Sequence, residues 1–265
     1  MKISDAIVVV TGGGSGIGRA LALALGDRGA RHVVVTDVGE AAAVDAAAAV
    51  RQKRTRAAAS AIRLDVTDAV AVTAAVAAIE ADIGPIGLWF SNAGVSRGRG
   101  LGSLEDWNAT IGVNLLGHVH GATSVLPLMA KRGEGHFIVT ASAAGLLTDL
   151  RSAPYSASKH AAVGLSEWLA IDAPEGVGIS CVCPEGVRTA MTRSDSSRSA
   201  KDITFLEPDE VARIVLDAVE RGDFLVLTHT RTAEYEGRRV ADRARWLKGM
   251  RKARKLASES FPAAT

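Results

Sequence analysis

The stretch AIVVVTGGGSGIGRALALAL, residues 6–25, decides the fold. It begins as a short run of β-branched residues, passes through a glycine-rich turn, and ends in an alanine- and leucine-rich segment of helical character. In such an arrangement, backbone NH groups and the positive end of the helix dipole can receive a pyrophosphate. Gly12, Gly16 and Gly18 form T-G-x-x-x-G-I-G rather than a literal G-x-G-x-x-G. The stretch predicts a dinucleotide-binding unit at the start of the chain.

The alternation of short β-rich runs and longer helical segments continues along the chain. The expected strands are residues 6–11, 32–37, 61–65, 87–92, 136–142, 178–186 and 223–229. Most of these runs are continuously apolar, which is typical of strands buried on both faces of a parallel sheet. Long helices are expected at residues 69–83, 104–130 and 208–221. We therefore predict a single-domain, doubly wound α/β Rossmann fold, with a seven-stranded parallel sheet and helices on both faces.

Composition agrees with one globular unit. The 265 residues are 48% hydrophobic, which is enough for a large core. Residues 1–13 resemble a first strand more than a signal peptide, and no apolar stretch is long enough to span a membrane. Cys181 and Cys183 would share one face of a strand as free, buried thiols, which indicates a reducing compartment.

Positive charge is concentrated near the C-terminus. Residues 231–255 contain ten Arg or Lys and three Asp or Glu, a local charge of +7, whereas the whole chain carries +2. Val240, Ala244, Leu247 and Met250 recur near helical spacing. We expect residues 1–230 to form the domain, residues 231–257 a basic amphipathic helical extension of it, and residues 258–265 a disordered tail. The extension could pack on a neighbouring subunit or over the substrate pocket, lie on an anionic membrane, or bind an acidic partner. No motif for nucleic acid accompanies it.

Tyr155 and Lys159 stand four residues apart in PYSASKHAAVGLSEWLA, residues 154–170. A helix beginning near Pro154 would place both on one face. A cation one helical turn away favours the phenolate, so the phenol could exchange a proton with an alcohol. Such a pair alone is also common on solvated helices. Ser142, at the end of the strand expected at residues 136–142, would converge on it at the carboxyl edge of the sheet.

These motifs together resemble the short-chain dehydrogenase/reductase family. TGGGSGIG (residues 11–18), SNAG (residues 91–94), Asn114, Ser142 and YSASK (residues 155–159) occur in that family's order and separations, and the resemblance covers about residues 5–230. It implies that Tyr155 gives or takes the proton, that Lys159 lowers the pKa of Tyr155 and binds the nicotinamide ribose, and that Ser142 orients the substrate oxygen. It also implies that Asn114 supports a water-mediated proton relay, while the nicotinamide cofactor moves the hydride.

The same resemblance implies a set of cofactor contacts. They are Gly12, Ser15, Gly16, Ile17, Gly18, Asp37, Val38, Asp65, Val66, Asn92, Ala93, Gly94, Tyr155, Lys159, Pro184, Val187 and Thr189. Asp65 could also cap the next helix. Glu185 replaces the usual glycine of Pro-Gly-x-Val-x-Thr, which brings a charge near the nicotinamide unless the backbone turns the side chain outward.

Asp37 bears on the choice of cofactor. It ends the second strand nineteen residues after Gly18, about where an acid binds the adenosine ribose hydroxyls of NAD. A carboxylate there would repel the 2′-phosphate of NADP. NADP users of the resembling family commonly carry a basic residue where this chain has Ser15 or Val38. We therefore predict NAD rather than NADP, the alternative being that Asp37 only caps the strand end.

The predicted function is NAD(H)-dependent interconversion of a secondary alcohol and a ketone, with no metal ion. The substrate is expected to be a small, mainly apolar or cyclic molecule, and the protein a cytoplasmic homo-oligomer, either dimer or tetramer. Residues 95–102, 146–151 and 190–205 are expected to select the substrate, and the last segment resembles a mobile lid. The alternatives are an NADPH-dependent 3-oxoacyl thioester reductase and a catalytically silent NAD-sensing or scaffold protein.

Overall fold

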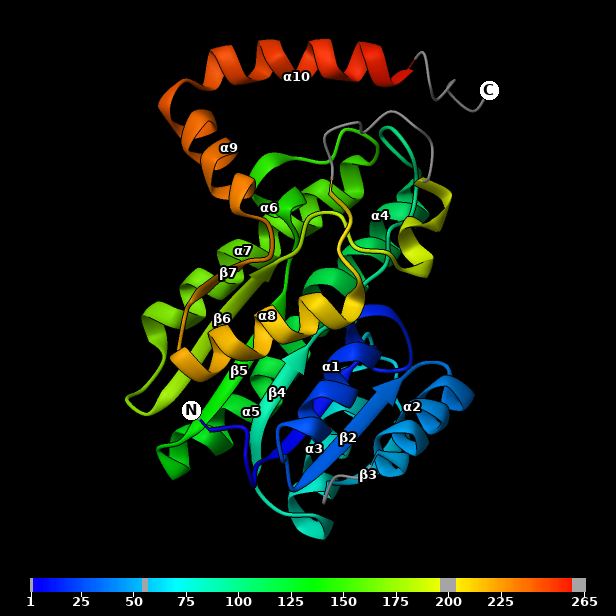
Figure 1. The fold of residues 1–265 in the computed structure, drawn as a ribbon, viewed down its shortest axis with the longest axis vertical. Helices are drawn as coiled ribbons and strands as arrows, with labels where there is room; N and C mark the ends of the chain where they lie inside the picture. The colour runs from blue at the N-terminus through cyan, green and yellow to red at the C-terminus, as the bar shows by residue number, and fades with distance from the viewer. Residues whose placement is uncertain (1, 54–56, 196–203, 259–265) are drawn as a thin grey trace.

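A computed structural model describes residues 2–53, 57–195 and 204–258. At its centre is one parallel sheet in the order β3-β2-β1-β4-β5-β6-β7 (Figure 1). The strands are β1 (Ile7–Thr11), β2 (His32–Asp37), β3 (Ala58–Arg63), β4 (Ile86–Ser91), β5 (Gly135–Thr140), β6 (Val177–Cys183) and β7 (Leu225–Leu227). The order reverses between β1 and β4, which opens a crevice at their carboxyl ends. The predicted doubly wound, seven-stranded sheet is confirmed.

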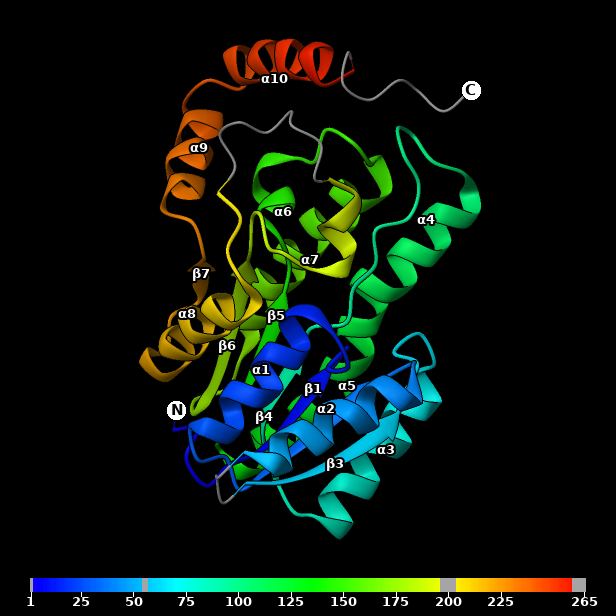
Figure 2. The same ribbon diagram turned by 45° about the vertical axis from the view of Figure 1, so that its right-hand side comes forward.

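Helices cover both faces of this sheet (Figure 2). One face carries α1 (Gly16–Asp27), α2 (Glu40–Gln52) and α8 (Pro208–Arg221), and the other carries α3 (Ala69–Asp82), α5 (Gly117–Arg132) and α7 (Ala153–Asp172). Within β1, Val8 and Val10 belong to the first of the two cores, and Ile7 and Val9 belong to the second. Because successive side chains of a strand point to opposite faces, burial on both sides explains the continuously apolar strands.

The third strand differs from the expected residues 61–65. It pairs with β2 from His32 opposite Ala58 to Asp37 opposite Arg63, so it begins earlier and ends earlier. β3 is an edge strand with several partly exposed residues, and its bounds follow the pairing rather than the apolar pattern. The cap of the next helix is Asp68, not Asp65, because the Asp68 side chain accepts hydrogen bonds from the backbone of that helix's first turn.

The helix expected at residues 104–130 is interrupted. It consists of α4 (Leu104–Ile111), a π-helical turn η1 (Gly112–Leu116) and α5. A π-helical turn widens the backbone ring by one residue, and such turns are frequent at functional sites. This turn holds Asn114, which is fully buried.

The C-terminal extension forms two helices instead of one. α9 (Thr230–Ala241) rises beside α6 (Ala143–Leu147), and α10 (Arg243–Ser258) crosses above it (Figure 1). Asp242 breaks the helix with an extended backbone, and its side chain accepts a hydrogen bond from the Arg245 NH at 2.9 Å. The predicted tail lies outside the described residues except for Ser258, which ends α10.

Three further features of the described residues bear on the predictions made from the sequence. Cys181 and Cys183 are free and buried on β6, with their sulfur atoms 3.9 Å apart. Within the described ranges, no helix combines the length and apolarity needed to cross a bilayer. In the same ranges, no three side chains among His, Cys, Asp and Glu gather as metal ligands would.

Candidate active site

A cavity of about 630 Å³ opens at the carboxyl edge of the sheet. Its volume lies in the range of sites for small molecules and cofactors. Every residue for which the sequence predicts a cofactor contact lines this cavity: Gly12, Ser15, Gly16, Ile17, Gly18, Asp37, Val38, Asp65, Val66, Asn92, Ala93, Gly94, Tyr155, Lys159, Pro184, Val187 and Thr189. The fold therefore brings these distant positions together, while their roles stay predictions.

The glycine-rich turn forms one wall because side chains would not fit there. A Cβ on Gly12, whose φ is +62°, would lie 2.8 Å from the Cα of Ala93. A Cβ on Gly18 would lie 2.2 Å from the carbonyl oxygen of Gly12. The turn leads into α1, whose N-cap residue Ser15 makes no side-chain capping hydrogen bond. The first helical turn thus keeps backbone NH groups that an anionic ligand could accept from.

Asp37 lies at the end of β2 beside this turn. Its Oδ2 accepts a hydrogen bond from the Gly14 NH and its Oδ1 accepts one from the Gly39 NH, each at 3.0 Å. Two backbone donors therefore hold the carboxylate at the cavity wall, and the neighbouring Val38 is 60% exposed. Asp65 is held by a local turn in which its Oδ1 accepts from the Thr67 NH at 2.9 Å.

Residues 92–94 are fastened to two strands. The Thr11 hydroxyl oxygen accepts from the NH groups of Asn92 at 2.9 Å and Ala93 at 3.1 Å. The Thr140 hydroxyl donates to the side-chain oxygen of Asn92 at 3.2 Å. Thr11 and Thr140 are not among the residues predicted from the sequence. The signal that could have identified them is a polar residue at the carboxyl end of an otherwise apolar strand, where parallel strands deliver their functional groups.

Ser142, Tyr155 and Lys159 converge at the other end of the cavity. Ser142 caps α6, and its Oγ accepts from the Ala144 NH at 3.1 Å. Tyr155 and Lys159 lie one turn apart on α7, and the Lys159 Nζ is 5.9 Å from the centre of the Tyr155 ring. The same Nζ donates to the Thr140 carbonyl oxygen at 2.8 Å. A hydroxyl, a phenol and an ammonium therefore face one space.

Burial changes the acid–base character of this group. Lys159 is only 3% exposed, and burial lowers its pKa from 10.5 to about 8. Burial also raises the pKa of Tyr155 above its usual 10, and the hydrogen bond with Ser142 offsets part of that rise. This direction is opposite to the expected lowering by Lys159. Loss of solvation of the phenolate is the largest cause, and it outweighs the lowering by the Ser142 hydrogen bond and by the charge of Arg151.

Asn114 lies behind the cavity wall rather than in it. Its Oδ1 accepts from the Val95 NH at 2.8 Å, and its Nδ2 donates to the Val95 carbonyl at 2.9 Å and to the Ser158 Oγ at 3.0 Å. The amide thus joins the loop after β4 to the helix that carries Tyr155 and Lys159. These contacts hold the loop and the helix together, and the proton relay implied by the resemblance stays a prediction.

The loop after β6 contains the unusual Glu185, which lines the cavity. Its carboxylate is paired with Arg231 and accepts a hydrogen bond from Thr232, both on α9. The non-glycine residues with positive φ in the described ranges are Asp5 and Thr148. Glu185 therefore does not need the backbone freedom of the glycine it replaces.

Thr192 supports the last two predicted contacts. Its hydroxyl donates to the Val187 carbonyl, and its Oγ1 accepts from the Thr189 NH at 3.0 Å. Thr189 in turn faces the glycine turn, since a Cβ on Gly16 would lie 3.2 Å from its methyl group. Thr192 is a further residue not predicted individually, within the segment expected to select the substrate.

Of the three segments expected to select the substrate, two contribute to the lining. Val95 and Arg97 come from the first segment, and Ala190, Met191 and Thr192 from the third. Residues 196–203 of that third segment lie outside the described residues. None of residues 146–151 lines the cavity, so their part in selecting the substrate stays a prediction.

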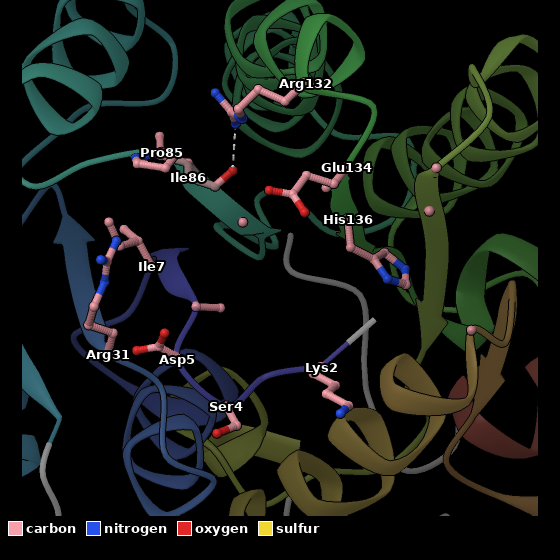
Figure 3. Close-up of a pocket in the computed structure, with 16 residues that line it drawn as sticks. Lys2, Ser4, Asp5, Ile7, Arg31, Pro85, Ile86, Arg132, Glu134 and His136 are labelled. Atoms are coloured by element: carbon pink, nitrogen blue, oxygen red, sulfur yellow. Dashed lines mark hydrogen bonds between the residues drawn. The ribbon is translucent and has the colours of Figure 1, made fainter.

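A second hollow, of about 580 Å³, lies at the opposite, amino edge of the sheet (Figure 3). Among the residues that line it are Arg132 and His136, whose side chains could in principle bind a ligand. The Arg132 guanidinium donates to Glu80 at 2.8 Å and to the Ile86 carbonyl at 2.9 Å. The His136 ring is hydrogen-bonded to Ser180 at 2.9 Å. Both side chains are bonded within the protein, so neither gives this hollow the character of an active site despite its similar volume.

The comparisons with known proteins agree with this geometry. The family model described as short chain dehydrogenase matches residues 6–200. The chain is 34% identical over 239 residues to 1-deoxy-11-beta-hydroxypentalenate dehydrogenase of Streptomyces avermitilis, with 86% of each protein covered. It is 35% identical over 195 residues to meso-2,3-butanediol dehydrogenase of Serratia marcescens, covering 72% of this chain and 75% of that protein. The solved structure of a short chain dehydrogenase/reductase from Burkholderia phymatum in complex with NAD matches with a TM-score of 0.80 and 30% identity, over 91% of this chain and 95% of that chain.

Proposed function

This protein belongs to the short-chain dehydrogenase family, and from that premise we propose that it is an NAD(H)-dependent oxidoreductase interconverting a secondary alcohol and a ketone. The observation that carries the proposal is the layout of the cavity at the carboxyl edge of the sheet. The glycine turn and Asp37 line one part of it, and Ser142, Tyr155 and Lys159 line another. One cavity can thus hold a dinucleotide and present a substrate to an acid–base group.

When bound in this cavity, NAD would supply the hydride acceptor or donor of the reaction. The protein handles the proton. During oxidation, the Tyr155 phenolate takes the hydroxyl proton of the alcohol, and during reduction the Tyr155 phenol returns it to the ketone oxygen. Ser142 is within hydrogen-bonding reach of Tyr155, and in this proposal its hydroxyl turns from the Pro184 carbonyl, 3.4 Å away, to donate to the same substrate oxygen. The two hydroxyls fix the reacting oxygen while the proton moves.

Lys159 acts on the charge and the position of the neighbouring groups. An ammonium group has three donors, and the Thr140 carbonyl takes one of them. The remaining donors are available to the hydroxyls of the nicotinamide ribose. Below its pKa of about 8 the side chain is cationic and offsets part of the negative charge on the phenolate.

The fit to NAD rests on the other part of the cavity. The uncapped first turn of α1 offers donors to a pyrophosphate, and the Asp37 carboxylate offers acceptors to ribose hydroxyls. A 2′-phosphate would meet that carboxylate without a basic residue at Ser15 or Val38 to balance it. The NAD complex of the Burkholderia phymatum relative supports the same choice.

A mainly apolar or cyclic alcohol is the proposed substrate class. Val95, Ala109, Val113 and Met191 supply apolar surface to the cavity. Two relatives are named as dehydrogenases of hydroxypentalenate and butanediol compounds, which supports an alcohol as the reduced substrate. By the family resemblance and the free buried thiols, we also place the protein in the cytoplasm as a homo-oligomer.

Tyr155→Phe tests the proposal, with Tyr235→Phe as the matched control because these are the two tyrosines of the chain. We expect the kcat for secondary alcohols with NAD to fall about a thousandfold in Tyr155→Phe, since general acid–base catalysis contributes about 10²- to 10⁴-fold. NAD affinity and Tyr235→Phe should change little.

Three outcomes would contradict this. Undiminished turnover in Tyr155→Phe would refute the proton transfer. Tighter binding of NADPH than NADH in a fluorescence titration would refute the cofactor and favour the thioester reductase. Tight NAD binding by a parent protein inactive on a broad panel of alcohols would favour the sensor or scaffold.

A further inference from the structure

Helix α9 begins with a contact to the loop after β6. The Arg231 guanidinium donates to both carboxylate oxygens of Glu185, through Nη2 at 2.6 Å and Nε at 3.2 Å. The Thr232 hydroxyl donates to the same carboxylate at 3.1 Å. The side chains of Glu185 and Arg231 are 15% and 22% exposed, and Thr232 is fully buried. Such a fork is directional as well as charged, so it holds the loop in one geometry.

The other end of α9 reaches the helix that carries Tyr155 and Lys159. The His160 Nδ1 lies 2.9 Å from the Ser156 carbonyl oxygen, which can only accept, so in a neutral ring the Nδ1 carries the proton. The His160 Nε2 is then the acceptor for Arg239, at 3.2 Å. α9 also packs against α6, which starts next to Ser142. Figures 1 and 2 both show α9 alongside α6.

The loop that Glu185 belongs to is connected directly to Ser142. The carbonyl oxygen of Pro184 accepts from the Ala143 NH at 2.8 Å and from the Ser142 Oγ at 3.4 Å. A movement of Glu185 would therefore shift the Pro184 carbonyl and, through it, the serine that faces the substrate oxygen. The same loop continues into Val187 and Thr189 on the cavity wall.

We propose that Glu185 is a positioning residue, which fastens α9 to the loop after β6 through Arg231 and Thr232. With the contact of Arg239 to His160, α9 becomes a strap between that loop and the catalytic helix. Glu185 therefore does more than replace a glycine at the cavity wall, because it makes the C-terminal extension part of the active site. This inference rests on the proposed function only where it predicts that the loss of the contact lowers turnover.

The contact needs both Glu185 and Arg231, because each side chain neutralises the charge of the other. A carboxylate and a guanidinium that are mostly buried are stable together, whereas removing one leaves the other poorly solvated and without its main partner. The Arg238–Glu234 pair on the same helix provides the contrast, since its side chains are 63% and 59% exposed. Exposed pairs of this kind contribute little.

The test compares Arg231→Met with Arg238→Met. We expect hydrogen–deuterium exchange to speed up in residues 184–192 and 143–147 of Arg231→Met, and to stay at parent levels in Arg238→Met. The kcat/KM for NAD should fall about ten- to a hundredfold in Arg231→Met, which is the scale of a misplacement of about 1 Å. Arg231→Lys keeps the charge but loses the fork, so it should recover part of the loss.

Glu185→Gln and the double variant Glu185→Gln/Arg231→Met complete the cycle. Because both changes remove the same contact, the double variant should lose no more kcat/KM than the more impaired single variant. Additive losses, or equal exchange in Arg231→Met and Arg238→Met, would overturn the proposal. The exchange measurement does not depend on turnover. A parent protein without oxidoreductase activity would therefore refute the proposed function, while the exchange rates would still test the strap.

Discussion

The two edges of the sheet carry hollows of similar size, about 630 Å³ at the carboxyl edge and about 580 Å³ at the amino edge. At the amino edge, polar side chains such as Arg132 and His136 are bonded to the protein itself. At the carboxyl edge, Ser142, Tyr155 and Lys159 face one space, and α1 begins with an uncapped turn. Parallel strands and the helices that follow them direct loops and helix N-termini to the carboxyl edge. The direction of the strands, not the volume of the hollow, therefore decides at which edge the candidate catalytic groups gather.

Between the two edges, the largest effect is expected for Ser142→Ala. Its counterpart is Ser180→Ala, because Ser180 is also buried and bonds His136 of the amino-edge hollow. Ser142→Ala should lower the kcat for alcohol oxidation about a hundred- to a thousandfold, because it removes a donor to the reacting oxygen. Ser180 bonds His136 and the Asp223 carbonyl. Its loss should cost about 1–3 kcal/mol of unfolding free energy with kcat almost unchanged. Steady-state kinetics and denaturant unfolding measure both. If Ser142→Ala and Ser180→Ala lost kcat equally, the proposed role of Ser142 at the carboxyl-edge cavity would be wrong.

The next effect is a pH dependence of stability due to Lys159. Its pKa is lowered from 10.5 to about 8, so burial disfavours the ammonium form. Below pH 8 both the folded and unfolded states hold the proton, and the cost of burying the charge is fully present. Between pH 8 and 10.5 only the unfolded chain keeps it. The unfolding free energy of the parent should therefore rise by about 3 kcal/mol relative to Lys159→Met across this window. Parallel pH profiles of the two proteins would show a normal lysine instead.

A smaller effect is expected for the cofactor. Asp37→Ser removes the carboxylate beside the glycine turn, and Glu134→Ser removes one from the amino-edge hollow. The preference for NAD over NADP, measured as the ratio of kcat/KM values, should fall about tenfold to a hundredfold in Asp37→Ser, since one charged contact is worth about 1.5–3 kcal/mol. Glu134→Ser should leave the ratio unchanged. If Asp37→Ser kept the parent ratio, Asp37 would be only a strand-end cap.

Much of the fold could be predicted because its signals are local. The apolar runs, the glycine pattern and the spacing of Tyr155 and Lys159 each lie within one segment, and each is found in the expected element. Boundaries were less predictable where pairing or capping set them, as at β3 and Asp68. The break at Asp242 depends on a single side-chain cap within a pattern that otherwise reads as one helix.

By itself, the sequence determined the sheet, the glycine turn and the residues that gather around one cavity, because hydrophobic periodicity and backbone freedom are properties of short segments. Only the tertiary structure decided how those residues behave. Burial raises the pKa of Tyr155 instead of lowering it, and Asn114 is used to hold Val95. Glu185 forms an ion pair with Arg231, which lies 46 positions later in the chain. Solvation and pairing depend on which distant segments pack together, and this packing made the C-terminal extension a neighbour of the active site.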